Sequence, residues 1–85
     1  MIVNNAGSVA GGSYFQIDPQ MLVDDANVDL VALFVINRIL MPKLRTRRHR
    51  SAILNICSCT GVYLSPYVGV YSCTKRSLNI YSQIL

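Results

Sequence analysis

A hydroxyl, a phenol and an amine occur in the second half of the chain at spacings that could support proton transfer. Ser58 ends an apolar run, Tyr71 follows it by thirteen residues, and Lys75 follows Tyr71 by four. A four-residue step places Tyr71 and Lys75 on one face of a helix, one turn apart. Residues 53–56, directly before Ser58, predict a buried strand that leads into a turn at Gly61. The pattern therefore predicts a phenol beside an ammonium, with a hydroxyl delivered from the end of a neighbouring strand.

The elements that must position these side chains alternate between strand and helix. Residues 1–7 are predicted to end a strand at Asn4-Asn5-Ala6-Gly7, and a loop follows. A helix is predicted to begin with Asp18 as N-cap and Pro19 in the first helical position, and to continue to about residue 45. A basic stretch, a strand and a final helix complete the chain. The order of strand, long helix, strand and long helix predicts half of a parallel α/β sheet.

Both predicted helices carry apolar faces. Residues 30–36 are apolar nearly all round, which predicts burial on more than one side, and Pro42 is expected to kink or end that helix. In the final helix, Tyr71 lies at the border between two sides, although an ordinary amphipathic helix fits this pattern equally well. The apolar side holds Cys73, Leu78, Ile80, Tyr81, Ile84 and Leu85, and the polar side holds Ser72, Lys75, Arg76, Asn79, Ser82 and Gln83.

Length and composition limit the possibilities. The 85 residues make at most one small domain, and 52% hydrophobic against 14% charged residues indicates a globular chain. No signal peptide is predicted after Met1, and the longest apolar run is too short to span a bilayer. Cys57, Cys59 and Cys73 are odd in number and unevenly spaced, which predicts reduced, packed thiols in an intracellular protein rather than disulfides or a metal site.

The net charge of +4 comes mainly from one stretch, residues 43–50, which holds five of the eight cations. Such a stretch could form a patch for nucleic acid or an anionic membrane. It could equally be a solvated helix end, where cations suit the negative end of the helix dipole. No aromatic residue is interleaved and the stretch joins a helix to a strand, so we favour the solvated helix end. We therefore expect neither nucleic-acid binding nor membrane contact from this chain.

Taken together, Asn4-Asn5-Ala6-Gly7 after a strand, Ser58, Tyr71 and Lys75 resemble the short-chain dehydrogenases/reductases. The resemblance spans essentially the whole chain and corresponds to the middle of that family's Rossmann fold. It implies an α/β, doubly wound parallel sheet, of which residues 1–85 would be the central part of a single dinucleotide-binding oxidoreductase domain, truncated at both ends. It also implies NADP or NAD as cofactor, and the interconversion of a ketone and a secondary alcohol on a hydrophobic substrate.

The resemblance assigns roles to three side chains. Tyr71 would be the general acid/base that exchanges a proton with the substrate oxygen. A free tyrosine is too weak an acid to serve as a base at neutral pH, and the Lys75 ammonium is expected to favour its phenolate. The matching lysine of the family also binds the nicotinamide ribose. Ser58 would hold the substrate oxygen by donating a hydrogen bond where charge develops.

The turn after the first strand would face the cofactor. Asn5, Ala6 and Gly7 would line the cleft at the carboxyl end of that strand, together with Tyr71 and Lys75, since ligands bind there in such sheets. For Asn4, the alternative role of bracing the turn between strands is at least as well supported.

One position departs from the family pattern. The family usually has an asparagine thirteen residues before the proline near the end of the long helix, and counting back from Pro42 gives Asp29. An acid there removes an amide donor and could place a carboxylate near Lys75, which would weaken the hold of Lys75 on the Tyr71 phenolate. We therefore expect a site less active than the family norm. Alternatively, Asp29 is a solvated helix residue in a shifted register.

Other parts of the family pattern have no counterpart here. Gly7, Gly11 and Gly12 do not have the Gly-x-Gly-x-x-Gly spacing of a phosphate loop, and in the family that loop precedes the Asn-Asn-Ala-Gly turn. The 85 residues alone are therefore expected to have weak or no activity. Residues 53–56, Ser65-Pro66 and residues 71–75, which follow the basic turn, look most like the hydroxysteroid dehydrogenase and very-long-chain 3-oxoacyl-CoA reductase branch. Full-length members of that branch are often bound to the endoplasmic reticulum, so we expect an intracellular protein, either cytoplasmic or associated with that membrane.

The same resemblance implies a homo-oligomer for the parent protein, built through the last helix. Two other function classes remain open. The chain could be a non-enzymatic, truncated relative that serves as an interaction piece, or a basic anion-binding module that uses residues 43–50.

Overall fold

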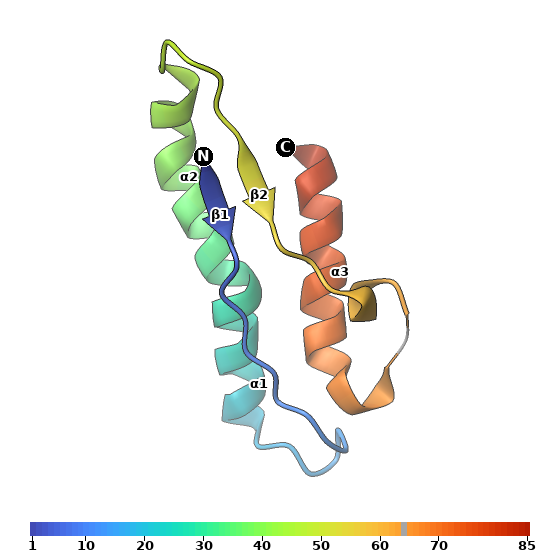
Figure 1. Ribbon diagram of the computed structural model, residues 1–85. Coiled ribbons are helices and arrows are strands. Elements are labelled where there is room, and N and C mark those ends of the chain that lie inside the picture. Colours follow the sequence, from blue (N-terminus) through green and yellow to red (C-terminus); the bar gives the residue numbers. More distant parts are fainter. Residues whose placement is uncertain (64) are drawn as a thin grey trace.

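The computed structural model describes residues 1–63 and 65–85. The chain runs through β1 (Ile2–Asn4), α1 (Pro19–Ala26), the π-helical turn η1 (Asn27–Val31), α2 (Ala32–Arg45), β2 (Ile53–Asn55), the 3₁₀ turns η2 (Cys59–Gly61) and η3 (Pro66–Val68), and α3 (Gly69–Ile84). The first three helical elements follow one another without a break and form one long helix (Figure 1). The predicted order of strand, long helix, strand and long helix is confirmed in the described part of the chain.

Local signals set the two ends of the long helix. The Asp18 carboxylate accepts a hydrogen bond from the Gln20 N–H at 3.1 Å, and Pro19 is the first helical residue, as the sequence predicts. Pro42 begins the last turn of α2, and the helix ends at Arg45. The π-helical turn in the middle was not predicted, because no residue type marks it.

The two strands pair in parallel, with Asn4 opposite Asn55. The Asn4 amide donates to Asn55 Oδ1 at 2.8 Å and to Asn37 Oδ1 on α2 at 3.3 Å. The Asn55 amide donates in turn to Ser82 Oγ on α3 at 2.8 Å. Because register partners point to the same side of a sheet, both long helices cover the same face of the strand pair (Figure 1). These bonds support the bracing role considered for Asn4.

The apolar core of the described residues is small. Ala10, Leu33 and Leu78 are its buried hydrophobic members. The prediction that residues 30–36 are buried on more than one side is wrong for this structure, since Val31 is 45% exposed and Val35 is 52% exposed. Two strands and two helices can cover only one side of α2.

The predicted faces of α3 and the predicted packing of the thiols are also wrong in part. Lys75, from the predicted polar side, is 4% exposed, whereas Ile84, from the apolar side, is 75% exposed. The helix meets the rest of the molecule along Thr74, Lys75 and Leu78, so hydrophobicity alone mispredicts the inner face. Cys57, Cys59 and Cys73 are free and exposed rather than packed, because they point away from the small core.

Candidate functional site

The phenol and the amine predicted from the sequence lie close together on α3. Lys75 Nζ is 5.4 Å from the centre of the Tyr71 ring, as a four-residue helical step requires. The ammonium also donates to the Ile56 carbonyl at 3.3 Å, directly after β2. Lys75 is buried and Tyr71 is half-buried. The ammonium and the phenol ring are therefore close enough to interact electrostatically, and Tyr71 is still partly exposed to solvent.

Ser58 lies on the turn that follows β2. It is the N-cap of η2, and its Oγ accepts hydrogen bonds from the Thr60 backbone N–H at 3.3 Å and from the Thr60 hydroxyl at 3.1 Å. Because the Ser58 hydroxyl hydrogen can rotate, Ser58 can donate to a further acceptor while its oxygen accepts from the Thr60 N–H.

The turn of Ser58 reaches α3 through Gly61. A Cβ added at Gly61 would lie 3.0 Å from the carbonyl carbon of Lys75 and 3.1 Å from the Arg76 nitrogen. Only a glycine permits so close an approach of η2 to the helix backbone. The structure thus seats the turn that carries Ser58 on the same stretch of α3 that carries Lys75.

The turn after β1 reaches the same place from the other strand. A Cβ added at Gly7 would lie 3.6 Å from Lys75 Nζ and 3.6 Å from Asp29 Oδ1. A methyl group at this position would be in van der Waals contact with both atoms, so Gly7 lies directly beside an ammonium and a carboxylate. Asn5 and Ala6 are exposed and line a pocket of about 140 Å³ that Asp29 also lines.

Asp29 is not a solvated helix residue, since only 2% of it is exposed. Its Oδ1 accepts from the Ser8 N–H at 2.7 Å, and its Oδ2 lies 3.2 Å from the Thr74 hydroxyl oxygen. The Thr74 hydroxyl also lies 2.8 Å from the Tyr71 carbonyl oxygen, so two acceptors share its single hydrogen. Asp29 thus joins the turn after β1 to the helix that carries the phenol and the amine.

Sequence reasoning missed two buried polar residues of this region, Thr74 and Asp25. Asp25 is 4% exposed, and its carboxylate accepts a hydrogen bond from the Ala10 N–H. Its spacing was the available signal, because an acid four residues before Asp29 lies on the same helix face. For Thr74 the sequence offers only its position next to Lys75.

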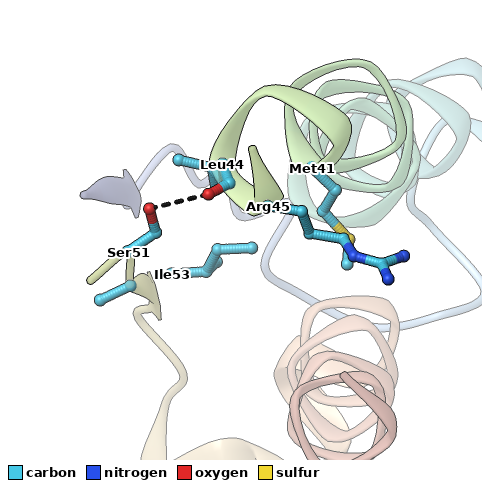
Figure 2. Close-up of a pocket in the computed structure, with 6 residues that line it drawn as sticks. Met41, Leu44, Arg45, Ser51 and Ile53 are labelled. Carbon is cyan, nitrogen blue, oxygen red and sulfur yellow. Dashed lines mark hydrogen bonds between the residues drawn. The ribbon is translucent and has the colours of Figure 1, made fainter. Parts of the chain in front are cut away.

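The opposite end of the molecule has a different character. A pocket of about 240 Å³ lies where α2 passes to the amino end of β2, and there the Ser51 hydroxyl donates to the Leu44 carbonyl at 3.1 Å (Figure 2). The cations of residues 43–50 are exposed around it. The pocket is lined by Met41, Leu44, Arg45, Ser51, Ala52 and Ile53. It lies away from the strand carboxyl ends and contains none of the predicted site residues.

In the part of the chain that the structure describes, no helix combines the length and the hydropathy that crossing a membrane requires. Within residues 1–63 and 65–85, no three His, Cys, Asp or Glu side chains gather in a way that could hold a metal ion.

Comparison with known proteins gives concordant results. The sequence model of the short chain dehydrogenase family matches residues 1–85. The chain is 32% identical over 89 aligned residues to the very-long-chain 3-oxoacyl-CoA reductase of Bos taurus, and 31% identical over 85 to the 3-ketodihydrosphingosine reductase of Bacteroides thetaiotaomicron. Both alignments cover 100% of this chain, but only 28% and 31% of those relatives, respectively.

A solved structure is similar in backbone as well. The 3-oxoacyl-[acyl-carrier protein] reductase with bound NAD from Brucella melitensis superposes with a TM-score of 0.80 at 28% identity, over 93% of this chain and 32% of that one. The parallel strand pair and its two helices therefore correspond to part of a Rossmann-type domain.

Proposed function

Because the chain belongs to the short chain dehydrogenase family, we propose that it carries the proton-transfer site of an enzyme that interconverts a ketone and a secondary alcohol. In this proposal Tyr71 is the general acid/base, Lys75 supports its phenolate, and Ser58 holds the substrate oxygen. The cofactor is NADP or NAD, and the substrate is a small hydrophobic carbonyl compound or alcohol.

The observation that carries the proposal is the buried ammonium beside the phenol. Lys75 is 4% exposed, and its bond to a neutral backbone carbonyl compensates only part of the loss of hydration. A buried ammonium of this kind is costly for stability, which favours a functional reason for its place. Lys75 Nζ lies 5.4 Å from the centre of the Tyr71 ring, which places the buried ammonium directly beside the phenol.

The residues around Gly7 fit a nicotinamide cofactor. Lys75 has three N–H donors, and among residues 1–63 and 65–85 one of them is directed to the Ile56 carbonyl, so the other two could donate to ribose hydroxyls. Gly7 has no side chain to cover the ammonium, whereas a Cβ there would be in van der Waals contact with Lys75 Nζ. Asn5, Ala6, Gly7, Tyr71 and Lys75 would hold the cofactor, which supplies hydride exchange when it is bound.

The chain's own residues then handle the proton. In the reducing direction the Tyr71 hydroxyl gives its proton to the substrate oxygen, and in the oxidising direction the phenolate takes the proton from the alcohol. The Ser58 hydroxyl can donate a hydrogen bond to the same oxygen, where negative charge develops during reduction. The exposed side of Tyr71 admits the substrate.

The names of the relatives suggest the substrate class. One relative is named as a reductase of very-long-chain 3-oxoacyl-CoA and the other as a reductase of 3-ketodihydrosphingosine, which favours a lipid-like ketone as the substrate. We further propose that the parent protein is a homo-oligomer and that it acts inside the cell, in the cytoplasm or at the endoplasmic reticulum.

The test is the substitution Tyr71→Phe in the protein that carries this chain. We expect loss of NADPH- or NADH-dependent reduction of a long-chain 3-oxoacyl thioester, because the transferable proton is removed, while Lys75 and residues 5–7 still hold most of the cofactor affinity. Tyr67→Phe is the matched control, since Tyr67 is 71% exposed on the preceding turn. Full turnover by the Tyr71→Phe variant would overturn the assignment.

A further inference from the structure

Two buried carboxylates of the long helix hold the loop that follows the Asn-Asn-Ala-Gly turn. The Ser8 N–H donates to Asp29 Oδ1 at 2.7 Å, and the Ala10 N–H donates to Asp25 Oδ2. Asp25, Asp29 and Ala10 are all nine-tenths or more buried, at 4%, 2% and 4% exposed. We call this arrangement the carboxylate clamp. In it, the Asp29 carboxylate accepts from the amide of residue 8, and the Asp25 carboxylate accepts from the amide of residue 10.

The spacing of the clamp matches two backbone repeats. Alternate residues of an extended segment lie about 6.6 Å apart on one side, and residues four apart on a helix rise by about 6 Å. The loop and the helix run in opposite directions, so Ser8 meets Asp29 and Ala10 meets Asp25. The π-helical turn η1 begins at Asn27, between the two acids. A π-helical residue rotates the chain by less than an α-helical residue does, so the four residues from Asp25 to Asp29 complete close to one full turn of the helix. The extra width therefore helps to align both carboxylates with the loop.

Stability alone does not explain the clamp. Like charges four residues apart destabilise a helix, and buried carboxylates lose hydration that backbone amides replace only in part. The neighbouring Asp24 shows the ordinary arrangement, since it is exposed and its carboxylate accepts a hydrogen bond from the Gln20 side chain. The clamp fixes the segment directly after Gly7, whose Cα faces Lys75 Nζ.

We propose that Asp25 is a positioning residue of the cofactor cleft, an inference that rests on the proposed function. Asp29 holds one end of residues 8–10 and Asp25 holds the other. Together they set how far Gly7 stands from Lys75, and so the width of the space that the cofactor would enter. Asp25 acts on the cofactor through the loop and does not touch it.

The test compares three variants in the protein that carries this chain. Asp25→Ala removes the acceptor for the Ala10 amide and is expected to weaken the binding of NADPH or NADH by about tenfold, with kcat at saturating cofactor nearly unchanged. Asp25→Asn keeps an acceptor oxygen and is expected to restore most of the affinity. Asp24→Ala is the matched control on the solvent side and is expected to bind like the unmodified protein.

Amide hydrogen exchange can be measured on the unmodified protein, so this test does not depend on whether a variant folds. The clamp predicts slow exchange at Ser8 and Ala10 and fast exchange at Val9, for whose N–H no acceptor is found among the described residues. Equal exchange at all three amides would overturn the clamp even if Asp25→Ala fails to fold. In the Asp25→Ala variant, the Ala10 amide is expected to exchange rapidly.

The outcomes separate this inference from the proposed function. If the Asp25→Ala variant binds the cofactor as tightly as the unmodified protein, the role of Asp25 is wrong and the proposed function stands. If the unmodified protein binds neither NADPH nor NADH, the proposed function fails, and the cofactor role of Asp25 fails with it. A loss of affinity that Asp25→Asn does not restore would also contradict positioning by an acceptor oxygen.

Discussion

The two ends of the long helix carry opposite charges, and these charges differ in their burial. All four acids of the chain lie between residues 18 and 29, and two of them, Asp25 and Asp29, are buried. Five of the eight cations lie in residues 43–50, at the other end, and all five are exposed. The buried acids hold the loop that follows β1, whereas the exposed cations lie in the last turn of α2 and in the segment that leads to β2.

This difference indicates which charges have a structural or chemical task. Among the described residues, the buried polar side chains are Asp25, Asp29, Asn37, Thr74 and Lys75, and they outnumber the buried hydrophobic ones. Burying a charged group is unfavourable unless it is paired and hydrogen-bonded. Exposed cations at a helix end are screened by solvent and contribute little. Substitutions at the two ends should therefore have very different effects.

The largest effect is expected at Lys75. Lys75→Met keeps a long unbranched side chain but removes the ammonium beside Tyr71. We expect kcat of the protein that carries this chain to fall about 100-fold or more, the usual range for general acid–base catalysis. The free energy of unfolding is expected to stay equal or to rise, because a buried charge has been replaced by an apolar group. Steady-state kinetics and urea unfolding check the two parts. Retained turnover would show that the buried ammonium has no role in the reaction, and that burial does not distinguish the charges with a chemical task.

A smaller effect is expected at Asp29. In Asp29→Asn the amide oxygen can still accept from the Ser8 N–H, and the new N–H₂ can donate to the Thr74 hydroxyl. The variant also removes a negative charge from the far side of the space beside Lys75. We expect kcat to rise by about threefold to tenfold, since that charge opposes the action of the ammonium on the phenol. An unchanged kcat would mean that the acid does not lower the activity of the site.

The smallest effect is expected in the basic segment. The double substitution Arg47→Gln and Arg48→Gln removes two exposed cations for which the structure gives no hydrogen bond within the described residues. The free energy of unfolding should change by less than about 0.5 kcal/mol, with kcat and KM unchanged. Salt-dependent binding of nucleic acid or anionic vesicles that this double variant loses would show instead that the basic end has a partner.

The sequence predicts best what depends on neighbours in the chain. Asp18 and Pro19 start the long helix as predicted, because capping and the fixed φ of proline act locally. Tyr71 and Lys75 meet because four residues make one helical turn. The burial of Lys75 could not be predicted in this way, since it depends on the Ile56 carbonyl and on the turn at Gly7, both distant in sequence.

The clamp eluded prediction for the same reason. In the sequence Asp25 looks like an ordinary helix acid and Asp29 stands out only as a departure from the family pattern, and nothing marks either one as an acceptor for the loop of residues 8–10. The π-helical turn Asn27–Val31, which contains Asp29, has no residue type that marks it in the sequence. The exposed cysteines illustrate the converse error, since hydrophobic character predicts burial only where a core exists to receive the residue.

The amide pair formed by Asn4 and Asn55 has a consequence for how the sheet assembles. The other residues of β1 and β2 are Ile, Val and Leu, and such side chains pack almost equally well in shifted alignments. A slip of one residue would turn one amide to the opposite face of the sheet and break the chain of bonds that runs from Asn37 through both strands to Ser82. Only one alignment of the strands lets all four side chains bond, so this polar ladder selects the correct pairing from among apolar alternatives.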